Sequence, residues 1–146
     1  MILPVSLRDL HAIHLLEREV FRLDAYPHFD LFILLITPGV INLKAVDDSG
    51  RLIGFVSGAK AWLPGRPAWI ITLCVAANQQ NKGIGRKLLL ACEERMGSPR
   101  VRLTVRAGNA SAIHLYETSG YQHIATNWRY YRDGEDGLVM EKAVQN

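Results

Sequence analysis

The stretch QNKGIGRK, residues 80–87, joins two apolar runs. The run before it, AWIITLCVAA at 68–77, is almost entirely apolar and rich in β-branched residues, which predicts a strand buried on both faces. The run after it has apolar residues at helical spacing, which predicts a helix over 84–96. A strand that enters a helix through two glycines leaves backbone N–H groups free at the positive end of the helix dipole. The stretch therefore predicts an anion-binding turn.

Two common nucleotide motifs do not fit this turn. A Walker A loop requires glycine at position 80 and Ser or Thr after its lysine, whereas this chain has Gln80 and places Leu88 after Lys87. A dinucleotide fingerprint requires a third glycine at position 88, which is again Leu88. Lys82, Arg86 and Lys87 can add charge-assisted contacts to an anion. A glycine turn with a cationic first helical turn and no ligand stays open as the alternative.

Length and composition predict one globular domain spanning residues 1–146. The chain has 49% hydrophobic and 21% charged residues, and its formal net charge is +3. The cations are dispersed rather than gathered into one long stripe, so we expect no nucleic-acid partner. Such a mild charge suits a polyanionic small ligand or an acidic partner.

Cysteine usage and hydropathy bear on the compartment. Cys74 and Cys92 lie inside apolar runs without the clustered spacing of a metal site or a disulfide scaffold, so we expect buried thiols and no metal. The N-terminus lacks the pattern of a signal peptide, and the apolar segment 31–41 is interrupted by Pro38 and Gly39. We expect a cytoplasmic protein without a membrane-embedded segment.

The remaining periodicities predict an α/β domain of order β-α-α-β-β-β-α-β-α-β-β with a mixed sheet. Besides the strand and helix around the turn, the expected elements are a strand at 2–5, helices from a Ser6–Asp9 capping box to about 21 and at about 29–36, strands at 41–46 and 51–62, a strand at 101–107, a helix capped by Asn109 and closed by Gly120, and strands at 121–127 and 137–142.

Two motifs resemble those of the GNAT superfamily of acyl-CoA-dependent N-acyltransferases. Residues 80–85 match its signature of Gln or Arg, two residues, Gly, one residue, and Gly or Ala. The segment VRAGNASAIHLYETSGY, residues 105–121, is similar to its second conserved block. The resemblance implies a single-domain GNAT fold with a mixed, mostly antiparallel central sheet flanked by helices, and acetyl-CoA as co-substrate.

The resemblance narrows toward the protein N-terminal acetyltransferases, including those that act on ribosomal-protein alanine. The segment LTVRAGNASAIHLYETSGY at 103–121 and RYYRDGEDGLVME at 129–141 are similar to theirs, and DAYPHF at 24–29 resembles their substrate loop. This implies direct attack of a protein or peptide α-amine on acetyl-CoA in a ternary complex, by a monomer or homodimer. A small-molecule amine acceptor stays open, as does a non-catalytic acyl-CoA-binding module.

The resemblance also implies the site residues. The backbone at Leu73, Cys74 and Val75 would pair with the pantetheine arm, and the Val75 N–H would face the thioester oxygen. The groups expected at the rest of the cofactor are Gln80, Lys82, Gly83, Gly85, Arg86, Lys87, Asn109 and Tyr116. Tyr116 would donate a hydrogen bond or a proton to the sulfur of coenzyme A. A core aromatic stays open as the alternative for Tyr116, and a plain N-cap stays open for Asn109.

Thr104 departs from the family pattern. The bacterial alanine acetyltransferases have a glutamate at this position, proposed to relay the substrate proton, and threonine cannot act as that base. A water chain, Asp24 or His28 would replace it, although Asp24 could be only a solvated loop acid. Because a free α-amine has a pKa of about 8 against roughly 10.4 for lysine, the loss favours an α-amine acceptor.

The expected acceptor groove involves three tyrosines. Tyr26 lies in the DAYP loop, and Tyr130 and Tyr131 are adjacent in a segment expected to be extended. Adjacent residues of an extended chain point to opposite faces, so we expect one of the pair to line the cleft and the other to pack. Two packing aromatics near Trp128 stay open as the alternative.

Overall fold

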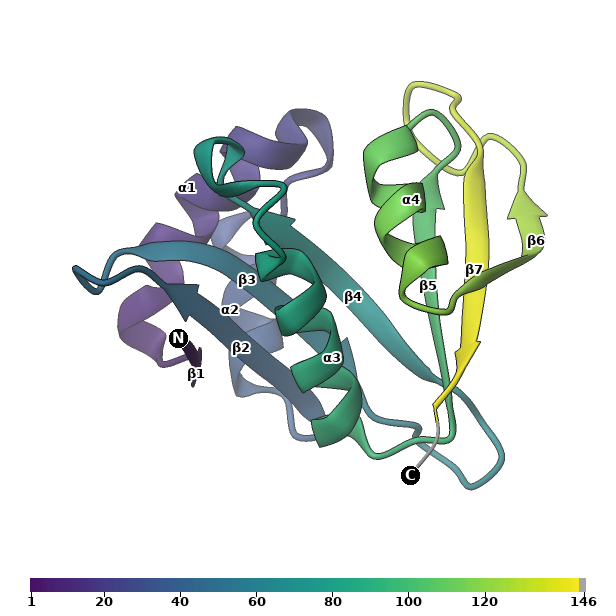
Figure 1. Ribbon diagram of the computed structural model, residues 1–146, viewed down its shortest axis with the longest axis horizontal. Helices are drawn as coiled ribbons and strands as arrows, with labels where there is room; N and C mark the ends of the chain where they lie inside the picture. The colour runs from purple at the N-terminus through teal and green to yellow at the C-terminus, as the bar shows by residue number, and fades with distance from the viewer. Residues whose placement is uncertain (145–146) are drawn as a thin grey trace.

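The strands form one mixed sheet in the computed structural model, which describes residues 1–144 (Figure 1). The predicted domain of 1–146 thus ends just outside the described residues. The strands are β1 (Ile2–Pro4), β2 (Val40–Val46), β3 (Leu52–Ala59), β4 (Ala68–Val75), β5 (Arg100–Arg106), β6 (Gln122–Asn127) and β7 (Gly137–Ala143). The helices are α1 (Leu10–Phe21), α2 (His28–Ile36), α3 (Ile84–Met96) and α4 (Ala110–Thr118).

The strand order across the sheet is β1-β2-β3-β4-β5-β7-β6. Only the neighbours β4 and β5 are parallel, and the other five pairs are antiparallel. The order of helices and strands and the mostly antiparallel sheet confirm the predicted GNAT fold. The main difference in extent is β3, which ends at Ala59 rather than near residue 62.

The parallel pair separates soon after it begins. β4 and β5 are paired only at Ala68↔Val101 and Trp69↔Arg102, and the two strands diverge beyond this point (Figure 1). The register against β3 passes from Gly58↔Ile70 to Ser57↔Thr72, so Ile71 is an extra residue in β4. Such a bulge bends and twists its strand, which accounts for the separation.

The separation overturns one expectation about β4. The strand was expected to be buried on both faces, but Trp69 is 37% exposed and Ile71 and Leu73 are only half-buried. These side chains lose cover because β5 moves away from them. The opening between β4 and β5 is therefore a built-in gap in the sheet.

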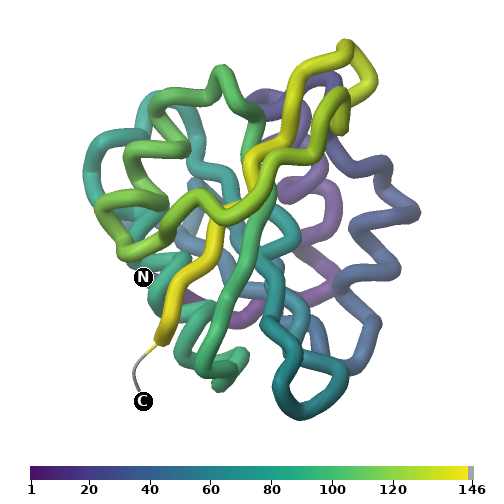
Figure 2. The backbone as a smooth tube through the Cα atoms, turned by 90° about the vertical axis from the view of Figure 1, so that its right-hand side faces the viewer, coloured from purple at the N-terminus to yellow at the C-terminus, as the bar shows by residue number. Residues whose placement is uncertain are grey.

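Helices cover both faces of the sheet. The pair α1 and α2 lies on one face and the pair α3 and α4 on the other, as the two views agree (Figures 1 and 2). The predicted stripe of α3 is confirmed, because Leu88, Cys92 and Met96 are buried in the larger core. Gly58 of β3 lets α3 approach closely, since a Cβ there would lie 2.6 Å from the Met96 sulfur.

The N-terminal capping signal is also confirmed. The Asp9 carboxylate accepts a hydrogen bond from the Ser6 N–H at 2.9 Å, and a 3-10 turn, Leu7–Asp9, precedes α1. A second 3-10 turn, Arg22–Asp24, and the residues Ala25–Pro27 connect α1 to α2. Within residues 1–144, no helix combines the length and apolarity needed to cross a membrane.

Candidate active site

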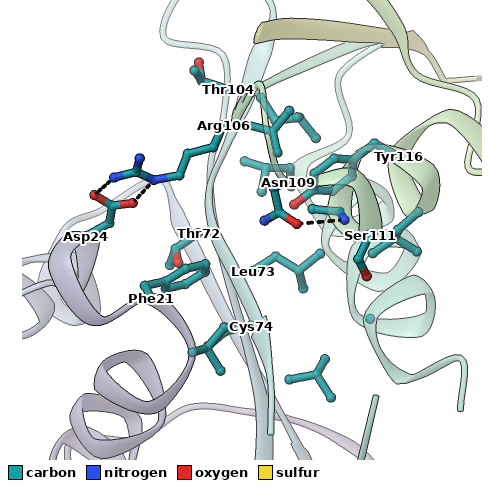
Figure 3. Close-up of a pocket in the computed structure, with 18 of the residues that line it drawn as sticks. Phe21, Asp24, Thr72, Leu73, Cys74, Thr104, Arg106, Asn109, Ser111 and Tyr116 are labelled. Atoms are coloured by element: carbon teal, nitrogen blue, oxygen red, sulfur yellow. Dashed lines mark hydrogen bonds and ion pairs between the residues drawn. The ribbon is translucent and has the colours of Figure 1, made fainter. Parts of the chain in front are cut away.

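The gap between β4 and β5 opens into a cavity of about 1420 Å³. Its walls come from the α1–α2 connection, β4, the turn before α3, β5, α4 and the loop between β6 and β7. Figure 3 shows the two walls, with Leu73 of β4 facing Asn109 and Tyr116, and with Thr72 and Cys74 on the other side of the strand, toward Phe21.

Thirteen of the fifteen residues proposed from sequence line this cavity. They are Asp24, Tyr26, Leu73, Cys74, Val75, Gln80, Gly83, Gly85, Arg86, Asn109, Tyr116, Tyr130 and Tyr131. The other two, Lys82 and Lys87, are exposed outside it. The Lys82 ammonium instead donates to the Gln79 side chain at 3.3 Å.

The backbone of β4 presents polar groups to the cavity that are not paired with a neighbouring strand. The Ala76 N–H donates to the Ile53 oxygen on β3 at 2.8 Å. Backbone polar groups of successive residues in a strand point to opposite sides, so those of Leu73 and Val75 point away from β3 into the gap. The Gln80 side chain donates to the Val75 oxygen at 3.1 Å and braces the turn against the strand.

The turn before α3 presents free N–H groups to the same cavity. Gly83 is the N-cap in the left-handed conformation, with φ +80°, and it has no side chain to cap the helix. The first helical hydrogen bond is donated by the Lys87 N–H to the Gly83 oxygen at 3.1 Å, which leaves the N–H groups of residues 84–86 without a helical acceptor. This is an anion-binding helix terminus.

Two contacts fix that terminus against α4. A Cβ at Gly85 would lie 3.2 Å from Leu115 of α4, so glycine allows the two helices to approach. The Arg86 guanidinium donates to the Thr118 oxygen at 2.9 Å and to its hydroxyl at 2.7 Å. The Arg86 side chain is thus engaged within the fold, while its backbone N–H stays free for a ligand.

The opposite wall is formed by α4. The Asn109 side-chain oxygen accepts from the Ala112 N–H at 3.2 Å, which confirms the predicted N-cap and leaves the amide nitrogen of Asn109 available. Tyr116 is 8% exposed and packs edge-to-face on Tyr121, with ring centroids 5.9 Å apart. It therefore belongs to the core and also lines the cavity. Burial raises the pKa of Tyr116, so its phenol stays protonated at neutral pH.

Arg106 of β5 binds carboxylates from both sides of the cavity mouth. It forms a two-point ion pair with Asp24, at 2.6 and 2.8 Å, and also reaches Asp133 and Glu135 at 2.9 Å (Figure 3 shows the Asp24 pair). Its guanidinium lies over the Tyr131 ring, 4.2 Å from the centroid. The Asp24 bonds, followed by those of Glu135, raise the pKa of Arg106. Asp24 is therefore an ion-paired residue rather than a solvated loop acid.

The acids of the β6–β7 loop hold that loop in place. The Glu135 carboxylate also accepts from the Gly108 N–H at 2.9 Å, and the Asp136 carboxylate accepts from the Arg129 N–H at 2.9 Å. Sequence reasoning missed the role of Arg106. The signal was the single arginine of VRAGN beside the acid-rich RDGEDG turn.

The expectation for the tyrosine pair was wrong. Tyr130 and Tyr131 both line the cavity and contact each other edge-to-face, with ring centroids 5.0 Å apart. They do not point to opposite faces because the chain turns here, with Arg129 at φ +52° and Gly134 at φ +90°. Burial raises the pKa of Tyr131 to about 12.

The candidates for the missing base lie in different places. Thr104 lines the cavity, but His28 lies outside it. The His28 ring stacks on that of His14, with ring centroids 3.6 Å apart, and its Nε2 lies 3.4 Å from His11 Nδ1 on an exposed surface. In the part of the chain that the structure describes, no group of three or more His, Cys, Asp or Glu side chains is arranged to hold a metal ion. Burial raises the pKa of Cys74, which leaves that thiol neutral and a poor nucleophile.

A buried carboxylate beside the cavity was not anticipated from sequence. Glu17 of α1 is 0% exposed, and its Oε2 accepts a hydrogen bond from the Thr72 hydroxyl at 3.0 Å. Burial raises the pKa of Glu17, and the hydrogen bond from Thr72 offsets part of that effect. The apolar periodicity of α1 gave no sign of it, since Glu17 follows Leu16 on the buried side.

Comparison with known proteins gives a consistent result. The model of the acetyltransferase (GNAT) family matches residues 7–121. An uncharacterized N-acetyltransferase of Methanocaldococcus jannaschii is 30% identical over 145 residues, covering 97% of this chain and 90% of that protein. The ard1 catalytic subunit of the Schizosaccharomyces pombe N-terminal acetyltransferase A complex is 31% identical, covering 70% of this chain and 63% of the subunit.

Solved structures share the fold. The ribosomal-protein-S18-alanine N-acetyltransferase of Escherichia coli superimposes with a TM-score of 0.87 at 24% identity, covering 100% of this chain and 94% of that one. Arabidopsis thaliana NAA60 in complex with acetyl-CoA gives a TM-score of 0.84 at 20% identity, covering 99% of both chains.

Proposed function

The chain belongs to the acetyltransferase (GNAT) family, and on that premise we propose that this enzyme acetylates the N-terminal α-amine of a protein or peptide, using acetyl-CoA. The observation that carries the proposal is one cavity that combines an open strand edge, an anion-binding helix terminus and a tyrosine-lined mouth. Relatives named as N-terminal or N-alpha-acetyltransferases support this choice of acceptor.

The donor fits the groups that line the cavity. The free N–H groups of Gly85 and Arg86 are suited to the pyrophosphate of coenzyme A. The open backbone of Leu73 and Val75 is suited to the amides of the pantetheine arm, and the Asn109 amide nitrogen faces them from α4. Lys82 and Lys87, which lie outside the cavity, would contribute only positive potential near its opening.

The chemistry needs a neutral amine, a stabilised oxyanion and a proton for the leaving sulfur. We assign the Val75 N–H to the thioester oxygen, because it points into the gap from the open edge of β4. We assign Tyr116 to the sulfur, because its buried phenol keeps its proton at neutral pH. In one ternary complex the amine nitrogen forms the new C–N bond and the thioester carbonyl becomes the oxyanion. The C–S bond breaks as the oxyanion collapses, the sulfur takes a proton from Tyr116, and the nitrogen gives up its extra proton to water.

The acceptor would enter between Tyr26 on one side and Tyr130 and Tyr131 on the other. Both oxygens of Asp24 accept from Arg106, so we assign Asp24 to holding the acceptor loop in place. Because both carboxylate oxygens are engaged by the guanidinium, Asp24 is not placed to take a proton from the amine, and this argues for a different proton acceptor.

A pair of peptides tests the acceptor. One peptide carries a free α-amine and no lysine, and its partner has the same sequence with a blocked N-terminus and one added lysine. We expect acetylation of the first with no product from the second. Acetylation of the second alone would refute the α-amine proposal, as would turnover of polyamines or aminoglycosides with no peptide product.

A further inference from the structure

A row of polar side chains crosses the sheet beneath α1. Asn42 of β2 is paired with Ser57 of β3, and Ser57 is paired with Thr72 of β4. Directly paired residues of antiparallel strands project to the same face. Ser57 is 0% exposed, Thr72 is 7% exposed, and Glu17 of α1 completes the row through its hydrogen bond with Thr72.

This row carries most of the unsatisfied buried polar atoms. Four buried side-chain atoms lack a hydrogen-bond partner in residues 1–144, and three of them are Glu17 Oε1, Asn42 Oδ1 and Ser57 Oγ. A buried polar group without a partner destabilises the fold, and each such group calls for an explanation in function, strain or bound water. The three atoms belong to one row, and the member of that row on β4, Thr72, lines the cavity, which points to function.

Thr72 connects this row to the site of chemistry. Thr72 and Cys74 both line the cavity, from the side of β4 that Phe21 of α1 faces (Figure 3). The Thr72 hydroxyl donates to Glu17 Oε2, so its lone pairs remain able to accept from a group in the cavity. The other candidates for this role are occupied or distant, because Asp24 is paired with Arg106 and His28 lies outside.

We propose that Glu17, acting through the Thr72 hydroxyl, accepts the proton of the amine that attacks acetyl-CoA. This inference rests on the acetyl-transfer function proposed above. An N–H proton of the substrate ammonium passes to Thr72 Oγ1 as the hydroxyl proton of Thr72 passes to Glu17 Oε2. The result is a neutral amine and a neutral Glu17 carboxylic acid, which returns its proton to solvent before the next turnover.

The electrostatic setting suits this role. Burial raises the pKa of Glu17, which makes its ionised form a stronger base nearer to neutral pH. The titratable groups that face Glu17 are Cys74 on β4 and Tyr26 in the α1–α2 connection. Both have a raised pKa, so both are uncharged at neutral pH.

The experiment compares pH profiles of kcat/KM for a free-α-amine peptide. Glu17→Gln keeps the shape of the side chain and removes the base, while Thr72→Val removes the hydroxyl and keeps the β-branched shape. We expect each to lose about 10²-fold at pH 7 and less than about 10-fold at pH 9, because the amine then arrives deprotonated. Glu19→Gln, the same change at an exposed position of α1, should leave the profile unchanged.

Three further readouts separate a relay from a structural role. Thr72→Ser should restore activity because it restores the hydroxyl, and the Glu17→Gln, Thr72→Val double variant should be no slower than either single variant. Acetyl-CoA affinity, measured by calorimetry, should stay within about twofold of the wild type in every variant. A loss of equal size at pH 7 and pH 9, or additive losses in the double variant, would overturn the relay.

The two proposals can fail separately. If the wild type acetylates a small amine and no peptide, the proposed acceptor is wrong, and the same variants measured with that amine still decide the relay. If the wild type acetylates the peptide and Glu17→Gln keeps the wild-type profile, the relay alone is wrong.

Discussion

At the scale of single residues, Gly83 has the clearest consequence for donor binding. Its φ of +80° favours glycine, and a Cβ there would meet nothing within 4 Å, so a side chain would project into open space. Gly83→Asp adds a negative charge where we propose that a pyrophosphate binds, together with strain of about 1–2 kcal/mol. We expect no saturable acetyl-CoA binding by calorimetry.

The matched control for this change is Gly50→Asp. Gly50 also has φ +83° and open space at its Cβ, but it lies in the β2–β3 turn. It should cost similar stability and leave acetyl-CoA affinity unaltered. Equal loss of binding in both variants would mean that backbone strain, rather than the anion site, explains the result.

Tyr116 and Tyr121 offer a second matched pair. Tyr116→Phe keeps the packed ring and removes the hydroxyl assigned to the sulfur, so kcat should fall about 10- to 100-fold with little change in melting temperature. Tyr121→Phe removes a 2.6 Å hydrogen bond to buried Glu93, so it should lose about 1–3 kcal/mol of stability with kcat preserved. Steady-state kinetics and thermal unfolding of the two variants decide the assignment, and the reverse pattern would contradict it.

At the scale of elements, Arg106 joins the α1–α2 connection to the β6–β7 loop across the mouth of the cavity. Arg106→Gln should release both segments, and we expect KM for the peptide to rise at least about tenfold while acetyl-CoA affinity stays close to that of the wild type. Arg102→Gln removes a comparable pair with Glu141 elsewhere on β5 and should leave KM unaltered. An unchanged peptide KM in Arg106→Gln would show that this ion-pair cluster does not shape the acceptor site.

The elements themselves could be read from the sequence wherever one signal dominated. Apolar spacing of Leu88, Cys92 and Met96 identified α3, and Asn109 identified the start of α4, because periodicity and capping are local properties. The bulge at Ile71 could not be read in this way. It exists because of how β4 pairs with β3, and nothing in the local composition records that register.

The same distinction holds for the site. The free N–H groups before α3 follow from local glycine chemistry, and so the sequence could predict the anion-binding turn. The Arg106 cluster, the buried Glu17 and the contact between Tyr130 and Tyr131 join residues through tertiary packing or a turn. Such pairings arise only in the folded chain, and of the three only the Arg106 cluster had a signal in the sequence, the arginine of VRAGN beside the acid-rich RDGEDG turn.

At the scale of the whole molecule, Glu17 should leave a mark on stability as a function of pH. Its folded-state pKa is raised above the ordinary 4.5, so the native state holds the proton more tightly than the unfolded chain. The free energy of unfolding therefore falls as the pH rises from the unfolded-state pKa of Glu17 through its folded-state pKa, and it stays lowered at every pH above both values. Glutamine has no such cost. The melting temperature of Glu17→Gln, relative to that of the wild type, should rise from pH 5 to pH 8. If the difference between the two melting temperatures stayed constant over this range, the pKa of Glu17 would not be raised in the folded protein.

We propose that one cavity brings acetyl-CoA to a peptide α-amine. The most direct measurement uses one peptide that carries both a free N-terminus and an internal lysine, incubated with the enzyme and acetyl-CoA and sequenced by tandem mass spectrometry. We expect a single acetyl group on the N-terminal nitrogen, and no acetyl group when the enzyme carries Gly83→Asp. Acetylation confined to the lysine side chain would contradict it.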